Sequence, residues 1–143
     1  MNYRESAEEL MESMKVLRKN TALQCLSDMS QGEMAVLCYL LFSHNGASAG
    51  ELTAEFKVRS SRTAAILNGL ERKGYAVRSS DPEDKRRVRV YITEKGKKFA
   101  WKEHEDAIRH FEYILQDIGQ EDSYHLVRII KRITKQLEEQ SGN

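Results

Sequence analysis

The chain has 143 residues, of which 40% are hydrophobic and 31% charged, and its formal net charge is +1. This length and composition are typical of one compact domain and leave too little chain for two separate cores. No stretch approaches the roughly 18 apolar residues of a membrane span, and the charged first residues do not resemble a secretory signal. The sequence therefore predicts a cytoplasmic protein without a membrane segment.

The first third of the chain predicts three helices. Residues 7–26 form the first, because apolar side chains recur three or four positions apart. In each of the segments 30–33 and 48–51, a serine precedes a glutamate by three positions, which is the pattern of a capping box. The first box predicts a helix over the apolar run 34–42, and the second predicts a short helix that contains Leu52 and Phe56.

The middle of the chain predicts a helix followed by a hairpin. A helix over about residues 60–73 places Thr63, Ile66, Leu67 and Leu70 inward and stops at Gly74. Together with the short helix before it, this segment has the pattern of a helix-turn-helix. Residues 75–78 and 88–92 are typical of strands, and the polar loop between them contains Asp81-Pro82. A helix-turn-helix followed by a hairpin with a charged tip predicts a winged helix.

From Thr93 onward the chain is predicted to be helical, with a break near Gly119. Its apolar residues form seams narrower than a core-facing stripe, and such seams suit packing against a partner helix. We therefore expect a homodimer of mainly α fold class: a winged helix-turn-helix domain with a small β-hairpin wing, plus a helical dimerisation lobe. The seam residues are Trp101, His104, Ile108, Phe111, Leu115 and Ile118, then Leu126, Ile130, Ile133 and Leu137.

Basic residues are concentrated between positions 57 and 89, where ten basic side chains accompany four acidic ones. A local basic block on a nearly neutral chain is the electrostatic footprint of a phosphate-binding face. A merely solvated surface would interleave its acidic residues more evenly. The basic residues are Lys57, Arg59, Arg62, Arg72, Lys73, Arg78, Lys85, Arg86, Arg87 and Arg89.

Four segments, 29–37, 51–56, 70–75 and 81–87, are followed by Ile-Thr-Glu-Lys-Gly at 92–96. In order and spacing they resemble the signature segments of the multiple-antibiotic-resistance regulator (MarR) family. The resemblance implies one MarR-type domain over residues 1–143. Its helical dimerisation lobe would comprise 1–28 and 97–140, and its DNA-binding lobe 30–96, with a recognition helix at about 60–73 and a wing at about 75–93.

The same resemblance implies a homodimeric transcriptional regulator, most often a repressor, that binds double-stranded DNA. The operator would be pseudo-palindromic, and a small-molecule or redox effector would release the protein from it. Asp84 and Arg86 match the family's Asp-any-Arg element, in which the carboxylate orients the guanidinium for the minor groove. The residue types support this role, because an arginine on a narrow hairpin suits a narrow, electronegative groove.

The exposed start of the recognition helix is the second expected contact surface. Arg62 is the candidate for a bidentate contact to guanine, and Ser60 and Ser61 suit phosphates, although Ser60 alternatively serves as the helix N-cap. At the position of Arg59 the family usually has a small hydroxyl residue. This departure leaves open a recognition helix whose start is shifted by one residue. The remaining expected DNA contacts are Ala64, Ala65, Arg78, Lys85, Arg87 and Arg89, with Arg78 and Arg89 alternatively only solvated.

Other residues favour structural roles. Cys25 and Cys38 are interpreted as small buried hydrophobes, with a redox-sensing thiol as the alternative. His104 and His110 are six positions apart, which does not suit one helical face, so no metal or cofactor is expected. Trp101 is interpreted as a core residue rather than the border of an effector pocket. No catalytic motif is present, so no enzyme is expected; the rival function is a winged-helix protein-interaction module without DNA binding.

Overall fold

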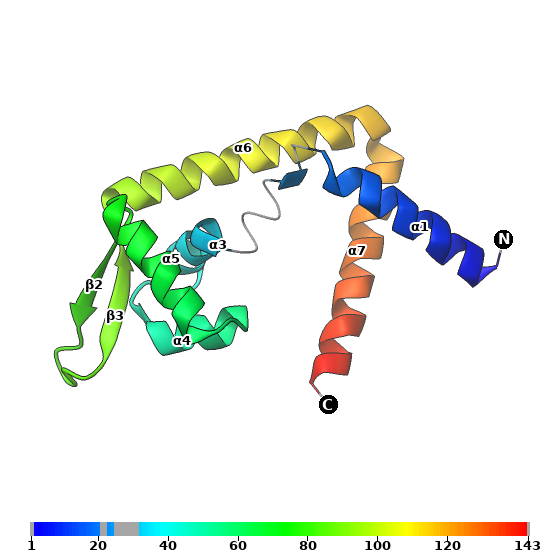
Figure 1. The fold of residues 1–143 in the computed structure, drawn as a ribbon. Coiled ribbons are helices and arrows are strands. Elements are labelled where there is room, and N and C mark those ends of the chain that lie inside the picture. The colour runs from blue at the N-terminus through cyan, green and yellow to red at the C-terminus, as the bar shows by residue number, and fades with distance from the viewer. Residues whose placement is uncertain (1, 21–22, 25–31, 143) are drawn as a thin grey trace. The chain divides into compact units, whose positions relative to one another are not determined.

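The computed structural model describes residues 2–20, 23–24 and 32–142. The chain divides into two units, Met1–Glu105 and Asp106–Asn143, and the long helix α6 contributes to both. Among the described residues the elements, labelled in Figure 1, are α1 (Tyr3–Arg18), α3 (Gly32–Phe42), β1 (Ala47–Ser48), α4 (Ala49–Phe56), α5 (Ser60–Arg72), β2 (Ala76–Ser80), β3 (Val88–Ile92), α6 (Glu94–Ile118) and α7 (Gln120–Ser141).

Helix α1 begins earlier than its apolar spacing predicts. Asn2 accepts a hydrogen bond from the Glu5 amide, and the Glu5 carboxylate accepts one from the Asn2 amide, which makes a complete capping box. The helix ends at Arg18 rather than running on to residue 26, and residues 21–22 and 25–31 lie outside the described part of the chain. The predicted bounds of 7–26 are therefore wrong at the amino end, because the capping box of Asn2 and Glu5 starts the helix before its apolar repeat begins.

Helices α4 and α5 form the helix-turn-helix, and the turn between them is short. The predicted capping box at Ser48 and Glu51 is confirmed, with the Ser48 hydroxyl accepting from the Glu51 amide at 3.1 Å. The box predicted at Ser30 lies outside the described residues. Helix α4 ends at Lys57, which adopts the left-handed conformation with φ 51° and ψ 43°. This conformation costs a non-glycine residue on the order of 1 kcal/mol or more.

Three antiparallel strands form one sheet in the order β1-β3-β2. The hairpin pairs Ala76 with Ile92 and Ser80 with Val88, so β2 begins one residue later and ends two residues later than the predicted strand 75–78. Strand β1 was not predicted; it adds Ala47 opposite Val90. Alternate residues of β3 share one face of the sheet, on which Val90 and Ile92 are buried while Val88, nearer the wing tip, is 40% exposed.

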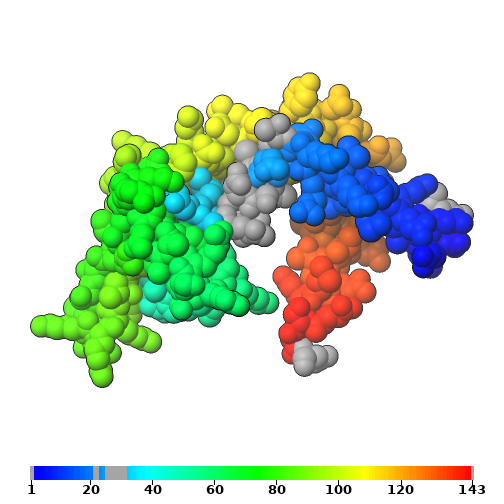
Figure 2. Space-filling model, viewed as in Figure 1, coloured from blue at the N-terminus to red at the C-terminus, as the bar shows by residue number. Residues whose placement is uncertain are grey.

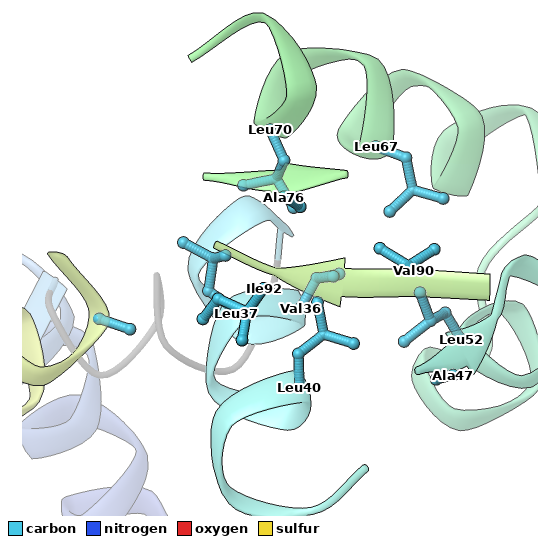
Figure 3. Packing of buried hydrophobic residues seen from close by; sticks show 11 residues of the cluster. Val36, Leu37, Leu40, Ala47, Leu52, Leu67, Leu70, Ala76, Val90 and Ile92 are labelled. Carbon is cyan, nitrogen blue, oxygen red and sulfur yellow. The ribbon is translucent and has the colours of Figure 1, made fainter. Parts of the chain in front are cut away.

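The core of the first unit lies between the sheet and its helices. In Figure 3, Leu67 and Leu70 of α5 and Val36, Leu37 and Leu40 of α3 converge on β3. Each large aliphatic side chain buried there contributes roughly 1.5–3 kcal/mol. Because α5 uses this face for the core, its opposite face stays free for another role. The buried cluster is completed by Ala47, Leu52, Ala76, Val90, Ile92 and Ala100.

The second unit consists of the end of α6 and the whole of α7. Gly119, with φ 90°, separates the two helices, as the predicted break requires, and the Ser123 hydroxyl donates toward the Leu115 and Gly119 carbonyls. Helix α7 buries none of its residues. Its large apolar side chains are exposed instead: Leu126, Val127, Ile129, Ile130, Ile133 and Leu137.

Candidate nucleic-acid interface

The outward face of α5 carries the residues predicted to read DNA. Its inward face is fixed by Leu67 and Leu70 in the core and by Thr63, whose hydroxyl lies 2.8 Å from that of Thr53 on α4. Arg59 is the N-cap and makes no side-chain capping bond, so the alternative in which Ser60 caps the helix is wrong, and the helix start is not shifted. The predicted contact residues of this helix are all exposed: Ser60, Ser61, Arg62, Ala64 and Ala65.

The turn between α4 and α5 adds two cationic side chains to this face. Together with Val58 and Ser61, the three residues Lys57, Arg59 and Arg62 line an open hollow of about 670 Å³. Within the described part of the chain, none of these three side chains has a hydrogen-bond or ion-pair partner. Lys57 and Arg59 belong to the basic block that the sequence predicts as a phosphate-binding face, but neither is among the individually predicted contacts. Their position beside Arg62 becomes apparent only from the fold.

The wing is the hairpin of β2 and β3, and it projects as a finger from the first unit (Figure 2, yellow-green). At its tip the Asp84 carboxylate accepts from the Arg86 amide at 3.1 Å and lies 3.4 Å from Arg86 Nε. The Arg86 side chain is nevertheless 93% exposed. The predicted Asp84–Arg86 pair therefore exists, and it restrains a guanidinium that remains accessible to a ligand.

The base of the wing is held by an ion pair that was not predicted. Arg89 Nε donates to the Asp81 carboxylate at 2.9 Å, and its Nη1 donates to the Gly46 carbonyl at 3.0 Å. The same carboxylate accepts from the Glu83 amide at 2.9 Å. The Glu83 amide and then Arg89 hold the pKa of Asp81 below its usual range. Arg89, predicted as a DNA contact or a solvated cation, thus spends part of its hydrogen-bonding capacity inside the protein.

The remaining predicted cations of the wing fall into two groups. Arg78 on β2 pairs with Glu71 of α5 at 2.6 Å and also donates to Asn68, so it ties the wing to the recognition helix. Lys85 and Arg87 at the tip are exposed, and within the described residues their side chains have no partner. The tip therefore offers free positive charge, whereas the strands use theirs for internal support.

The exit from the wing explains the Thr-Glu-Lys-Gly segment at 93–96. The Thr93 amide donates to the Tyr75 carbonyl at 3.0 Å, and its hydroxyl donates to the Gly74 carbonyl at 2.6 Å while accepting from the Gly96 amide. A Cβ at Gly96 would lie 2.1 Å from the Tyr75 carbonyl oxygen, so only glycine fits there. Gly74 itself has φ 78°, which confirms its predicted role as a left-handed stop.

Residues with other predicted roles lie away from this face. Burial raises the pKa of the Cys38 thiol, which favours its interpretation as a packing residue, since a redox sensor needs a thiolate. Cys25 lies outside the described residues. Trp101 is 46% exposed, so the core interpretation of this residue is wrong; its ring contacts Phe42 and His104. In the described ranges no group of three potential metal ligands occurs, and no helix is long and apolar enough to cross a membrane.

Comparison with known proteins gives one family. Residues 27–87 match the model of the MarR family. The HTH-type transcriptional regulator YfiV of Bacillus subtilis is 37% identical over 71 residues, which cover 50% of this chain and 44% of that protein. A second regulator of that organism, YkoM, is 33% identical over 67 residues, covering 47% of this chain and 43% of its own length. The matched segment thus spans less than half of either relative.

Solved structures extend the fold likeness to nearly the whole chain. A MarR family protein from Bacillus stearothermophilus has a TM-score of 0.76 and 22% identity, covering 96% of this chain and 99% of its own. FabT of Streptococcus pneumoniae, solved in complex with DNA, has a TM-score of 0.71 and 21% identity over the same shares. Residues 27–87 therefore resemble the MarR family, and the likeness to these solved structures shows that the winged helix-turn-helix fold extends over nearly the whole chain.

Proposed function

We propose that the protein is a sequence-specific transcriptional regulator that binds double-stranded DNA as a homodimer. The observation that carries the proposal is the distribution of unpartnered cations. Arg62 on α5 and Lys85 and Arg87 at the wing tip have no side-chain partner among the described residues, and all lie on exposed surfaces. A winged-helix module that only contacts proteins would not need these free charges. FabT, whose fold is similar, was solved with DNA.

Helix α5 is the element proposed to enter the major groove, which is about 12 Å wide and admits an α-helix. Its small exposed residues Ala64 and Ala65 let the helix approach the base edges closely. Arg62 then reads guanine through two parallel hydrogen bonds, the commonest specific contact. Ser60 and Ser61, in the first turn, bind a backbone phosphate, helped by the positive end of the helix dipole.

The wing is proposed to reach the adjacent minor groove with Arg86. Because Asp84 already restrains this guanidinium, less rotamer entropy is lost on binding than for an unrestrained arginine. Lys85 and Arg87 flank it and contact phosphates on either side of the groove. Arg78 orients β2 through Glu71, and Arg89 orients β3 through Asp81. Both guanidinium groups keep N–H donors available for the DNA backbone.

The exposed apolar residues of α7 support the homodimer. Ile130 and Leu137 are 54% and 58% exposed, which is costly for a helix with no covering surface. A second copy would bury them and present two recognition helices. The operator is then pseudo-palindromic, with half-sites about 34–36 Å apart, one turn of B-DNA.

A repressor that is relieved by an effector is the proposed mode of action. An effector acts by binding more tightly to a dimer whose recognition helices no longer match the half-site spacing. The cluster of the exposed Phe42 and Trp101 with the half-buried His104, whose ring centroids lie 4.9–5.8 Å apart, is a suitable contact for an apolar effector. Repression is tested by transcription in vitro from a promoter that contains the selected operator.

The proposal is tested by selecting bound fragments from a random duplex library and titrating salt against the winning sequence. Log affinity should fall steeply and linearly with log salt, since phosphate contacts release counterions. Arg86→Ala should weaken binding about tenfold, the order expected for one groove contact. Lys102→Ala, which removes an exposed charge from α6, is the matched control. A flat salt dependence, or an Arg86→Ala affinity equal to that of the control, would contradict the proposal.

A further inference from the structure

Gly69 lies in the interior of α5, a position where glycine is unfavourable. Alanine stabilises a helix interior relative to glycine, because glycine loses more backbone freedom on folding. Gly69 is buried, and a Cβ built on it would lie 2.2 Å from Glu33 Oε1 of α3. The next nearest atoms are Glu33 Cδ at 3.3 Å and Arg72 Nη2 at 3.9 Å. The missing side chain thus lets the Glu33 carboxylate lie directly against the backbone of α5.

The same carboxylate also holds the carboxyl end of α5. Its Oε2 accepts a hydrogen bond from Nζ of Lys73, the C-cap of this helix, at 2.5 Å. Glu33 lies in the first turn of α3, so each charge is at the helix end whose dipole stabilises it. The Lys73 carbonyl accepts from Lys95 Nζ of α6 at 2.8 Å. Directional contacts from two other helices therefore restrain this end of α5.

These contacts constrain a motion that the apolar core leaves less restricted. Leu67 and Leu70 hold α5 against the sheet, but hydrophobic attraction is non-directional and sets the tilt of a helix only loosely. Arg62 lies about 10 Å from Gly69 along the helix. At that distance a tilt of about 10° displaces a residue by roughly 2 Å. A recognition contact needs its groups placed to within about 0.5 Å, so the tilt of α5 decides whether Arg62 reaches its base.

We propose that Glu33 is a positioning residue for DNA recognition, which sets the tilt of α5 through Gly69 and Lys73. The inference rests on the proposed function, and Glu33 itself contacts no DNA in it. A carboxylate beside a basic block repels the phosphates of any duplex. Positioning and charge therefore have opposite effects. Removing the Glu33 carboxylate should weaken binding to the operator, and it should leave binding to other duplexes unchanged or stronger.

A purely structural role for Glu33 is the competing explanation. If the carboxylate only stabilises the start of α3 through the helix dipole, Glu33→Ala lowers the urea midpoint and the preference for the operator is retained. Gly69→Ala separates the two roles, because its methyl group displaces the end of a flexible side chain while alanine favours the helix. Its urea midpoint should equal or exceed that of the wild type, although its operator affinity falls.

The test compares Gly69→Ala, Glu33→Ala, Arg62→Ala and the double variant Gly69→Ala/Arg62→Ala in the full chain. Gly50→Ala is the matched control, since Gly50 is exposed on α4 and its added Cβ would lie 3.8 Å from Ser48 Oγ, an ordinary contact. Each protein is titrated against the selected operator and a random-sequence duplex. Gly69→Ala and Glu33→Ala should each lose about tenfold in operator affinity, the order of one mismatched base pair, and none for the random duplex. The double variant should bind the operator within about twofold of Arg62→Ala, because both changes remove the same contact.

The outcomes separate this inference from the proposed function. If the wild type prefers the operator but Gly69→Ala and Glu33→Ala bind it like Gly50→Ala, the positioning role is wrong and the regulator stands. Equal losses on both duplexes, or independent losses from Gly69→Ala and Arg62→Ala, would also overturn it. A lowered urea midpoint for Glu33→Ala with an unchanged operator preference would assign Glu33 to the start of α3. A wild type that binds both duplexes equally would overturn the proposed function itself, and this inference with it.

Discussion

The two units of this chain differ in where their apolar residues lie. The first unit encloses Leu37, Leu40, Leu67 and Leu70 almost completely, whereas α7 in the second unit buries no residue at all. Helices α5 and α7 both have the hydrophobic spacing of amphipathic helices, so spacing alone does not reveal which of them packs against the rest of its own unit. The difference indicates that the first unit is stabilised by its own core, whereas α7 of the second unit leaves its apolar residues exposed, as the proposed homodimer requires.

The largest expected effect comes from the core of the first unit. Leu37 is 0% exposed, and Leu37→Ala should lower the free energy of unfolding by about 2–5 kcal/mol, because it removes buried surface and leaves a cavity. Val77→Ala is the control, since Val77 lies on β2 of the same unit and is 50% exposed, and it should cost less than about 1 kcal/mol. Urea unfolding measures both. Equal losses would mean that the core does not stabilise this unit.

The second unit should reveal its need for a partner through dilution. If α7 is covered by another copy, each tenfold dilution lowers the apparent free energy of unfolding per dimer by about 1.4 kcal/mol. Ile130→Glu would place a charge in that interface and should give a monomer in light scattering, while Ile130→Leu should remain dimeric. An unfolding midpoint independent of protein concentration, with a wild-type monomer, would remove the basis for the proposed homodimer.

A smaller effect on stability is expected at the base of the wing, which belongs to the first unit but depends on an ion pair where the core depends on apolar packing. The pKa of Asp81 is lowered in the folded protein, so its ionised form stabilises the fold. That contribution is complete above the unfolded value of about 3.9 and is lost as pH falls through the lower folded value. The difference in urea midpoint between wild type and Asp81→Asn should therefore shrink from pH 6 to pH 3. A constant difference would show that the carboxylate charge is unimportant.

Local signals in the sequence were enough to predict most of the winged helix. The side chains of Ser48 and Glu51 each accept a hydrogen bond from the other residue's amide, within four residues of sequence. The stop at Gly74 depends only on the left-handed backbone of that one residue. Both features can therefore be predicted without knowledge of tertiary contacts. The outward face of α5 followed from the positions of Leu67 and Leu70. The Asp84–Arg86 pair lies two residues apart in one turn, and the family resemblance indicated it.

Features that depend on register or on distant contacts were not predictable in the same way. Strand β1 has two residues, Ala47 and Ser48, and becomes a strand only because β3 lies beside it. Arg89 meets Asp81 across the hairpin, so the pair depends on the register of β2 and β3. Lys57 was counted as charge, but the cost of its conformation becomes apparent only from its φ.

The Arg89 contacts have a consequence for protein engineering. One guanidinium joins the wing, through Asp81, to the loop before β1, through the Gly46 carbonyl. The wing therefore cannot be exchanged as an independent unit by replacing only the residues from the start of β2 to the end of β3. A chimera that takes its wing from a relative should inherit the donor's loop equivalent to residues 44–48 as well, so that the hairpin keeps its angle to the recognition helix.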